Sequence, residues 1–244
     1  MKILGIIPAR FASTRFPGKP LVQINGKSMV QRVYEQALKS SCLDEVLVAT
    51  DDTRIADEVK AFGGKYVLTS AAHISGTDRC AEVISKVLGF DAIINIQGDE
   101  PYIDPLQIDL LASCFKDATV QLATLIKKID VQEDLFNENI PKVVLNNRGE
   151  AIYFSRQTIP FLRSKDKHDW FANGDFYKHI GIYGYEAKTL LEITKLMPSK
   201  LELSESLEQL RWIENGYKIQ TRVTTIETIA IDSPEDLYKI EGMI

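Results

Sequence analysis

Three cationic residues fall within ten positions near the start of the chain, in the stretch IIPARFASTRFPGKPL at residues 6–21. Arg10, Arg15 and Lys19 follow an apolar run that has the composition of a buried strand. The chain as a whole carries a formal net charge of −5, with 29 Lys and Arg against 34 Asp and Glu. Because guanidinium and ammonium groups bind phosphate oxygens, this local excess predicts an anion site at the end of the first strand.

Hydroxyl and carboxylate groups follow other apolar runs. Ser75 and Thr77 belong to SGTDR, which comes shortly after the run KYVLTS. Asp99 follows the run DAIINIQ, and Asp232 precedes the last predicted helix. Ligands of open α/β sheets bind at the carboxyl ends of the strands, and carboxylate oxygens are ligands that Mg²⁺ prefers. Together with the three cations, these residues predict a triphosphate held with Mg²⁺.

Each of these features also has a purely structural explanation. Loop cations are commonly solvated, SGTDR has the pattern of a helix N-cap, and Asp232 would also cap the helix that Ser233 begins. Asp99 is harder to explain in this way, because a carboxylate that ends a buried strand needs a partner or a metal. The coincidence of these features, rather than any one of them, predicts the nucleotide site.

Apolar, β-branched runs alternate with amphipathic helical patterns up to about residue 120. This order is typical of a largely parallel sheet covered by helices. The predicted strands of this half lie at 2–7, 45–50, 65–70 and 91–97. The predicted helices of this half lie at 29–40, behind the N-cap Ser28, and at 51–64 and 77–88.

The second half of the chain has a different pattern. ETIAID is interpreted as a strand that runs beside DAIINIQ, so that Asp232 and Asp99 project over the same edge. A helix is predicted from Ser204 to about Asn215, and a last helix has Ser233 as its N-cap and Pro234 at its first position. Further strands are predicted at 120–129, 142–156 (a hairpin) and 177–187, and in YKIQTRV at 217–223.

Residues 157–175 are polar and aromatic and show little periodicity. Phe161, Trp170 and Phe171 need burial against something, which predicts a dimerisation arm or a lid within about 140–180. No linker or internal repeat divides the chain, so a single domain over residues 1–244 is expected.

The strand YKHIGIYGYEA alternates in polarity. Its period places Ile180 and Ile182 on one face, and His179, Gly181 and Tyr183 on the other. An apolar face toward the core leaves a polar face, opened by a glycine, toward the predicted cleft. The same alternation is also compatible with a purely structural explanation, in which His179 is a surface residue of the strand.

Composition excludes several classes of protein. The mild acidity argues against a general nucleic-acid binder, which usually shows a basic face. Three widely spaced cysteines without C-x-x-C spacing do not predict a disulfide framework or a zinc site. No apolar run approaches membrane-spanning length. The expectation is a cytoplasmic protein with no nucleic-acid or membrane partner.

Seven segments, in this order and spread over nearly the whole chain, resemble the 3-deoxy-manno-octulosonate (Kdo) cytidylyltransferases: IPARFASTRFPGKPL, SGTDR, NIQGDEP, YFSRQTIP, HIGIYGY, ESLEQLR and IDSPEDL. The sialate cytidylyltransferases share the P-A-R opening but lack QGDEP. The departures are small. SGTDR stands for the commoner S-G-T-E-R, and AIDSPEDL, with Ala230 and Ser233, stands for G-I-D-T-P-E-D-L.

The resemblance implies an activity and a fold. Enzymes of this family transfer CMP from CTP to the anomeric hydroxyl of Kdo, release pyrophosphate and require Mg²⁺, in lipopolysaccharide biosynthesis. They are usually dimeric, so a homodimer is expected. The implied fold is a three-layer, Rossmann-like nucleotide-diphospho-sugar transferase fold, α/β, with a mostly parallel central sheet and an inserted hairpin or arm.

The resemblance also assigns roles to matching positions. The residues expected to be catalytic are Arg10, Lys19, Asp99 and Asp232, the two aspartates as metal ligands. The residues expected to bind the nucleotide, besides those cations and Asp99, are Pro8, Ala9, Arg15, Ser75, Gly76, Thr77, Arg79 and Gln97. The residues expected at the sugar are Arg156, His179, Tyr183, Glu208 and Gln209, with Arg156 pairing with the Kdo carboxylate.

Three alternatives stay open. In the first, the enzyme is a cytidylyltransferase for 8-amino-Kdo, and in the second, it is one for a nonulosonate. In the third, the chain is a catalytically inactive, nucleotide-binding regulatory protein, which predicts loss of a metal aspartate or of Lys19, whereas all of them are present. The number of metal ions and the identity of a general base stay undecided, with His179 as one candidate base.

Overall fold

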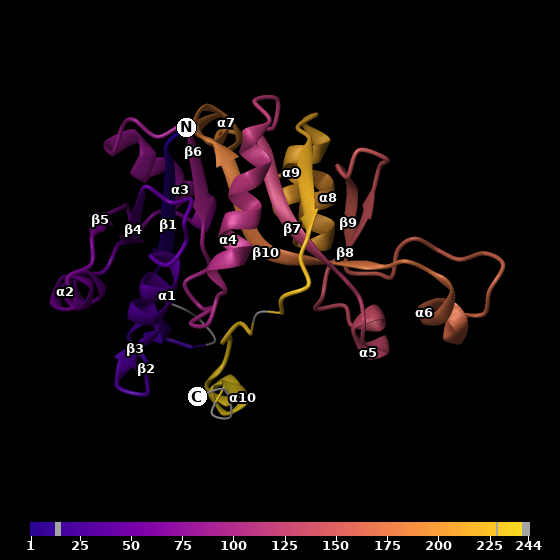
Figure 1. Cartoon of the computed structure of the whole chain (residues 1–244), viewed down its shortest axis with the longest axis horizontal. Coiled ribbons are helices and arrows are strands. Elements are labelled where there is room, and N and C mark those ends of the chain that lie inside the picture. The colour runs from indigo at the N-terminus through magenta and orange to yellow at the C-terminus, as the bar shows by residue number, and fades with distance from the viewer. Residues whose placement is uncertain (13–15, 228, 241–244) are drawn as a thin grey trace.

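The computed structural model describes residues 1–12, 16–227 and 229–240, and a nine-stranded sheet forms the centre of this part of the chain (Figure 1). Its strands are β1 (Ile3–Ala9), β4 (Glu45–Thr50), β5 (Tyr66–Leu68), β6 (Ala92–Asn95), β7 (Leu122–Lys128), β8 (Lys142–Leu145), β9 (Ala151–Ser155), β10 (Tyr177–Glu186) and β11 (Ile219–Val223). A separate small ribbon consists of β2 (Gln23–Ile24) and β3 (Lys27–Ser28).

The main path of the sheet runs β11-β7-β10-β6-β1-β4-β5, and β8 and β9 form a hairpin attached to β10. Strand β1 is parallel to β4 and β6, β4 is parallel to β5, and β7 is parallel to β11. Only β10 on the main path runs the other way among these described strands, antiparallel to β6 and β7. The carboxyl ends of β1, β6, β7 and β11 therefore lie along one edge of the sheet.

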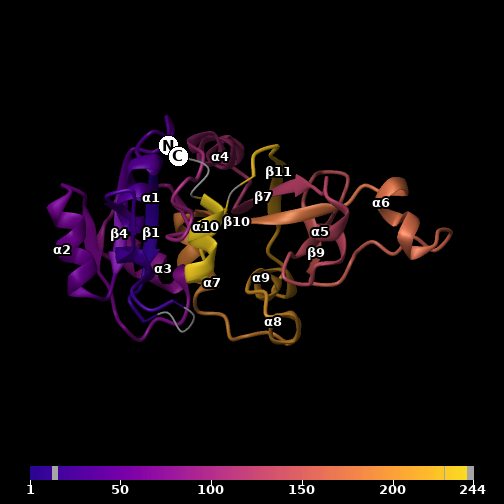
Figure 2. The same ribbon diagram turned by 90° about the horizontal axis from the view of Figure 1, so that it is seen from below.

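Helices cover both faces of the sheet; Figure 2 shows α4 and α7 on opposite sides of it. The α-helices are α1 (Met29–Ala37), α2 (Thr53–Ala61), α3 (Gly76–Lys86), α4 (Pro105–Ala112), α5 (Gln132–Phe136), α6 (Trp170–Asn173), α7 (Ala187–Ile193), α8 (Lys200–Glu205), α9 (Gln209–Glu214) and α10 (Leu237–Ile240). The 3-10 helices are η1 (Lys19–Leu21), η2 (Ser113–Lys116), η3 (Lys167–Asp169) and η4 (Pro234–Asp236). No helix in the described part of the chain combines the length and the apolarity that crossing a membrane requires.

Alternation along the strands divides the core into two layers. In β1, Ile3 and Ile7 pack in one layer, with side chains of α1, α2 and α4, whereas Leu4 and Ile6 pack in the other, with side chains of α3, α7 and α9. Strand β10 follows the same rule: Ile180 and Ile182 lie in the first layer, as the sequence predicts. The sheet is thus buried on both faces, and the prediction of a three-layer α/β fold is confirmed.

Two predicted elements are wrong. The helix predicted from Ser204 to Asn215 is two helices, because Ser206 has a left-handed φ of +52° that ends α8, and α9 begins at Gln209. The predicted strand ETIAID does not form among the described residues, and Asp232 lies in an irregular segment instead. Helices α4 and α7 also form in stretches for which the sequence patterns yielded no prediction.

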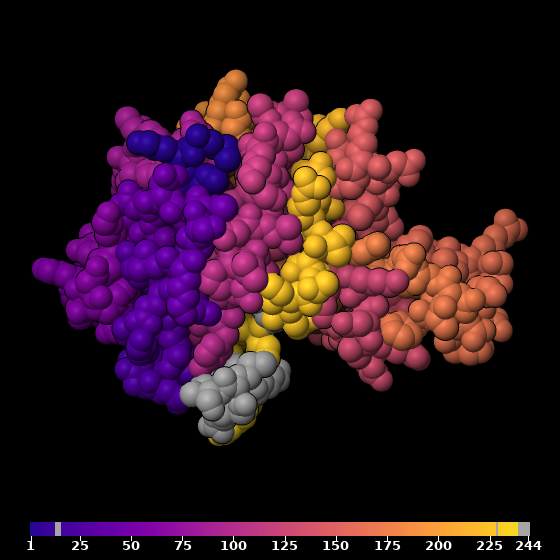
Figure 3. Space-filling view, in the orientation of Figure 1, coloured from indigo at the N-terminus to yellow at the C-terminus, as the bar shows by residue number. Residues whose placement is uncertain are grey.

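Residues 157–175 extend sideways from the sheet, and Figure 3 shows them as a lobe that projects from the body of the molecule. At the base of this arm, Trp170 is buried against Ile129, Leu135 and Phe176 of the same chain. Phe161 packs edge-on against the Trp170 ring and is still 72% exposed. The arm lies away from the tips of β1 and β6 in Figure 1. Its role as a dimerisation arm or as a lid stays a prediction.

Candidate active site

A cavity of about 320 Å³ opens at the carboxyl edge of the sheet, beside the ends of β1 and β6. It joins loops far apart in the sequence: the end of β1, the start of α3, the turn after β6, and Asp232. The sequence-predicted residues that line it are Pro8, Ala9, Arg10, Lys19, Ser75, Gly76, Arg79, Gln97, Asp99 and Asp232. After the prediction made for these residues, we call this cavity the nucleotide cleft.

Two predicted members of the site are not in that lining. Thr77 lies on α3, where it is buried and its hydroxyl donates to Glu208 Oε2 at 2.8 Å. Arg15 lies outside the described residues. The lining also contains Pro20, His73, Ile74 and Gly98, which the sequence reasoning missed. The position of His73, two residues before SGTDR, is the signal that would have found it.

Close approach of two backbones fixes the floor of the cleft. A Cβ at Gly98 would lie 2.7 Å from the Pro8 carbonyl oxygen, a distance that real side chains do not tolerate. Glycine therefore lets the QGDEP turn pack directly on the end of β1. In consequence, Asp99 is held within reach of the cationic loop.

The Lys19 ammonium lies between the two aspartates. Its Nζ is 2.8 Å from Asp99 Oδ2 and 3.6 Å from Asp232 Oδ1. The Ile231 amide donates to the Asp99 carbonyl oxygen at 2.9 Å, which brings Asp232 to this edge without a strand. Two carboxylates that converge on one cation offer the hard oxygen ligands that a divalent metal prefers, so the residues present fit such an ion.

The loop before Lys19 is anchored outside the cleft. The Gly18 amide donates to the Phe11 carbonyl oxygen at 2.9 Å, and Gly18 adopts a φ of +72°. The Phe11 ring lies under the Arg54 guanidinium, 3.3 Å from its carbon to the ring centroid. Asp52 in turn holds Arg54 through two side-chain hydrogen bonds of 2.9 and 2.6 Å. This stack links the loop to α2.

The start of α3 forms the opposite wall. Ser75 caps the helix by accepting from the Asp78 amide at 3.0 Å. Arg79 is buried, and its guanidinium donates to the Thr69 hydroxyl and lies 3.5 Å from Asp51 Oδ1. The structural explanation of SGTDR as an N-cap is thus confirmed, and its role at the nucleotide stays a prediction. His73 contacts Glu82 through its Nε2.

A second group of residues, among those predicted to bind the sugar, lies on the side of β10 that faces away from Ile180 and Ile182. After that prediction, we call this side the sugar face. The Gln97 side-chain amide donates to the Gly181 carbonyl oxygen at 2.7 Å and so connects the cleft to this face. Tyr183 packs against the rings of His179 and Trp212. Burial raises the pKa of the Glu208 carboxyl.

His179 is held as a neutral ring. Burial lowers the pKa of its imidazole to about 3. Its Nε2 lies 2.9 Å from the Thr124 hydroxyl, and that hydroxyl donates to the Ile182 carbonyl oxygen at 2.7 Å. Because Thr124 has one proton to give, Nε2 carries the histidine proton and donates to the hydroxyl oxygen. Nδ1 is then an acceptor, and such a weak base does not suit the role of general base.

Arg156, directly after β9, and Gln209, at the start of α9, are two further residues predicted at the sugar. The Arg156 guanidinium donates to the carbonyl oxygens of Glu205 and Glu138 at 2.6 and 3.1 Å, beside the turn between α8 and α9. Its planar fork has five N–H groups, so donors are left for a ligand. Gln209 is buried, and its Nε2 has no hydrogen-bond partner among the described residues. A buried donor of this kind suits a polar ligand.

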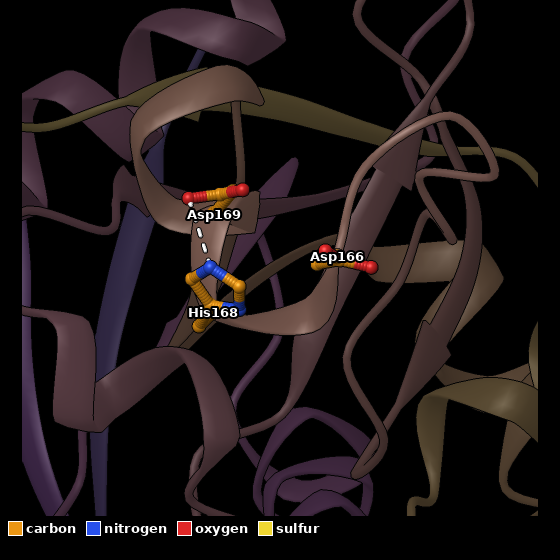
Figure 4. A group of neighbouring side chains, drawn as sticks. All are labelled: Asp166, His168 and Asp169. Carbon is orange, nitrogen blue, oxygen red and sulfur yellow. Dashed lines mark ion pairs between the residues drawn. The ribbon is translucent and has the colours of Figure 1, made fainter.

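A further group of possible metal ligands lies on the arm, far from the cleft in sequence. Asp166, His168 and Asp169 have ligand atoms within 4.8 Å of one another, and His168 Nε2 is 3.4 Å from Asp169 Oδ1 (Figure 4). Asp166 and His168 are exposed. This group shares no residue with the cleft.

Comparison with known proteins shows the relatives of this chain. The profile of the family described as Cytidylyltransferase matches residues 4–219. The 3-deoxy-manno-octulosonate cytidylyltransferase of Cytophaga hutchinsonii is 61% identical over 242 residues, which cover 98% of this chain and 96% of the relative. That of Porphyromonas gingivalis is 49% identical over 242 residues, 98% of this chain and 94% of the relative. The chain belongs to the 3-deoxy-manno-octulosonate cytidylyltransferase family.

Solved structures agree with this assignment. The structure of CMP:2-keto-3-deoxy-manno-octonic acid synthetase complexed with CTP has a TM-score of 0.92 and 42% sequence identity, covering 100% of this chain and 98% of that one. The 4-diphosphocytidyl-2C-methyl-D-erythritol synthase of Anaerococcus prevotii, 12% identical with a TM-score of 0.64, covers 99% of this chain and 97% of that one and shares the fold. The predicted family, fold class and nucleotidyltransferase activity are confirmed.

Proposed function

We propose that this family member transfers CMP from CTP to the anomeric hydroxyl of Kdo and releases pyrophosphate. The observation that carries the proposal is the convergence of Lys19, Asp99 and Asp232 in a cleft whose lining matches the family motifs. A related synthetase, 42% identical over the whole chain, was solved with CTP. The inactive-protein alternative predicts the loss of one of these groups, and all are in place.

The cleft suits a nucleoside triphosphate. The Arg10 and Lys19 side chains line it and supply positive charge for the phosphates. The end of β1 at Pro8 and Ala9 presents fixed backbone groups to the base, so we infer that cytosine fits and a larger purine overfills the gap. The hydroxyl of Ser75 and the amide of Gln97 border the same space.

A CTP-using nucleotidyltransferase requires a divalent cation, and we propose Mg²⁺ here. Asp99 and Asp232 are the side chains that would hold it, because they are the carboxylates of the cleft lining. When bound, the ion supplies positive charge that polarises the phosphate oxygens. Lys19 already lies against both carboxylates, so it competes with any cation that binds them.

The reaction is an in-line displacement. The sugar hydroxyl gives up its proton to solvent, its oxygen forms a bond to the α-phosphorus, and the bond from that phosphorus to the bridging oxygen breaks, so that pyrophosphate leaves. Arg10 and Lys19 neutralise the charge that grows on the leaving oxygen. On the sugar face, His179 Nδ1 accepts from a sugar hydroxyl, and Arg156 pairs with the sugar carboxylate. Most of the rate comes from this positioning and charge stabilisation.

Pyrophosphate release with CTP and Mg²⁺ tests the substrate assignment. Kdo, 8-amino-Kdo and N-acetylneuraminate are offered in turn at equal concentrations. We expect steady release with Kdo and rates at least about tenfold lower with the others, because the buried polar groups of a sugar site discriminate against a mismatched partner. If turnover is faster with 8-amino-Kdo or N-acetylneuraminate, that sugar and not Kdo is the substrate. If no sugar leads to pyrophosphate release, the alternative of a catalytically inactive regulatory protein is supported.

We also infer that the arm mediates a homodimer. Phe161 is 72% exposed on the projecting lobe, and large aromatic side chains gain by burial against a partner. Sedimentation at micromolar concentration should give a mass of two chains for the wild type and of one for Phe161→Asp. Leu106→Asp on α4, where Leu106 is 64% exposed, is the control and should stay dimeric. A one-chain mass for the wild type would contradict the inference.

A further inference from the structure

The segment between β11 and Asp232 crosses the carboxyl edge of the sheet without regular secondary structure, and we call residues 224–227 and 229–232 the strap (Figure 1). At its first end, the Thr224 amide donates to the Ile126 carbonyl oxygen at 2.8 Å. At its far end, Ile231 is fully buried and bonded to the Asp99 carbonyl oxygen. The strap therefore joins the end of β11 to the turn that carries Asp99.

Between those ends, two lysines on neighbouring strands hold the strap. Lys127 of β7 and Lys178 of β10 are directly opposite in the antiparallel register. The Glu227 carboxylate bridges them, with Oε2 2.7 Å from the Lys127 ammonium and Oε1 2.9 Å from the Lys178 ammonium. The two lysine side chains are only 11% and 7% exposed. Their charges are thus little screened by water, which strengthens their attraction for the carboxylate.

Each lysine has a second carboxylate that does not belong to the strap. Lys178 pairs with Asp134 of α5 at 2.8 Å, and Lys127 pairs with Asp130 at 3.0 Å. Burial acts to lower the pKa of Lys178, but the bonds to Asp134 and Glu227 outweigh it and raise that pKa. Without Glu227, each lysine would keep one counterion, so the sheet itself should survive its removal.

The described strap makes few other polar contacts with the rest of the protein before Ile231. The Gln107 side-chain amide of α4 donates to the Ile226 carbonyl oxygen at 3.3 Å, a long hydrogen bond. The Glu227 side chain is itself 48% exposed, yet it makes two ion pairs with buried partners. These pairs are thus the strongest polar contacts that the described strap makes with the sheet before it reaches the cleft.

We propose that Glu227 is a positioning residue, which clamps the strap to Lys127 and Lys178 and thereby holds Asp232 beside Asp99. The inference rests on the proposed function in one respect, the assignment of Asp232 to the metal site. Glu227 itself touches no residue of the cleft lining in these contacts. Its effect should therefore appear in metal affinity and in the mobility of the strap, and not in the chemistry once the metal is bound.

The test compares Glu227→Gln with the wild-type protein, since glutamine keeps the size and removes the charge. Hydrogen exchange of the peptide covering 229–233, without CTP or Mg²⁺, reports on the clamp directly. We expect exchange about tenfold faster, because local opening becomes easier. The Mg²⁺ concentration for half-maximal pyrophosphate release should rise about fivefold, with kcat at saturating Mg²⁺ within about twofold of wild type.

Two control variants separate positioning from general destabilisation. Asp175→Asn removes the exposed Lys128–Asp175 pair at the same end of β7, and it should change neither measurement. Asp134→Asn removes the other counterion of Lys178 without touching the strap. It should lower the melting temperature and leave the Mg²⁺ dependence as in the wild type.

If the peptide covering 229–233 exchanges hydrogen as slowly in Glu227→Gln as in the wild-type protein, the clamp is refuted. Faster exchange with unchanged Mg²⁺ dependence overturns the positioning role, provided that Asp232→Asn weakens Mg²⁺ activation in the same assay. If Asp232→Asn also leaves the Mg²⁺ dependence unchanged, the proposed metal site is refuted, and with it the role of Glu227 toward that site. The exchange experiment still decides the clamp in that case, so the two failures are distinguishable.

Discussion

In the nucleotide cleft, the Lys19 ammonium lies directly against the Asp99 and Asp232 carboxylates, whereas on the sugar face burial keeps His179 neutral and raises the pKa of Glu208. The first region concentrates charge on loops at a sheet edge. The second replaces charge with hydrogen-bonding groups on a strand and packed aromatic rings. Phosphates and a metal need fixed charges, while sugar hydroxyls need oriented donors and acceptors in a site from which water is excluded.

The largest test of this contrast removes one charge from the cleft. Asp99→Asn and Asp232→Asn keep the shape of the side chain, and turnover should fall on the order of 10³-fold, because the metal contributes several kcal/mol of transition-state stabilisation. Mg²⁺-dependent pyrophosphate release measures the effect, and the melting temperature checks the fold. Near-normal activity in Asp232→Asn would leave Asp99 as the sole protein ligand and refute the two-aspartate metal site.

Two glycines give a matched comparison of the two regions. Gly98→Ala places a methyl group 2.7 Å from the Pro8 carbonyl oxygen, whereas Gly181→Ala places one 4.0 Å from Gln97 Cγ, an ordinary contact. Gly98→Ala should lower the stability by about 1–3 kcal/mol and raise the KM for CTP. Gly181→Ala should change the stability by less than about 1 kcal/mol and raise the KM for Kdo alone. If both variants change the KM for CTP equally, the nucleotide cleft and the sugar face do not serve separate substrates.

The neutral state of His179 has a consequence for stability. Its folded pKa of about 3 lies below the ordinary value of 6.5, so below pH 6.5 the unfolded chain binds a proton that the folded chain does not. The neutral ring therefore contributes fully to the free energy of unfolding above pH 6.5, and this contribution is lost as the pH falls toward 3. The loss amounts to about 2 kcal/mol at pH 5. Melting temperatures of wild type and His179→Asn between pH 8 and pH 5 should therefore converge. If the melting temperatures of the two proteins instead change in parallel with pH, the His179 ring is charged or exposed in the folded protein.

The smallest expected effect concerns the anchor of the cationic loop. Arg54→Ala removes the guanidinium that lies over the Phe11 ring, and a cation–π contact at an exposed site contributes about 0.5–1 kcal/mol. The KM for CTP should rise about threefold, with the KM for Kdo unchanged. Steady-state kinetics in which CTP and Kdo are varied in turn measure the two KM values separately. A rise confined to Kdo would mean that the loop serves the sugar face.

Much of the cleft was predictable because its residues follow strands that the local pattern identifies. The apolar runs of β1 and β6 and the polar loops that follow them indicate an anion site from the sequence alone. Period-two alternation in β10 likewise assigned His179 and Tyr183 to the face opposite Ile180 and Ile182. The break at Ser206 was missed because serine rarely adopts a positive φ, so no residue there announces the end of α8.

The family, the layered α/β fold and the set of charged residues follow from the amino-acid sequence alone, since they depend on local periodicity and on motifs that are contiguous in the chain. The way in which Asp232 reaches Asp99 emerged from the folded arrangement: it is not a strand but a strap, held through Glu227 to lysines that lie 100 and 49 positions away in sequence. The folded arrangement also fixes which nitrogen of His179 carries the proton, through Thr124 on the neighbouring strand. Ion pairs and hydrogen bonds between distant segments leave no periodic trace in a sequence, because neither partner is constrained by its own neighbours.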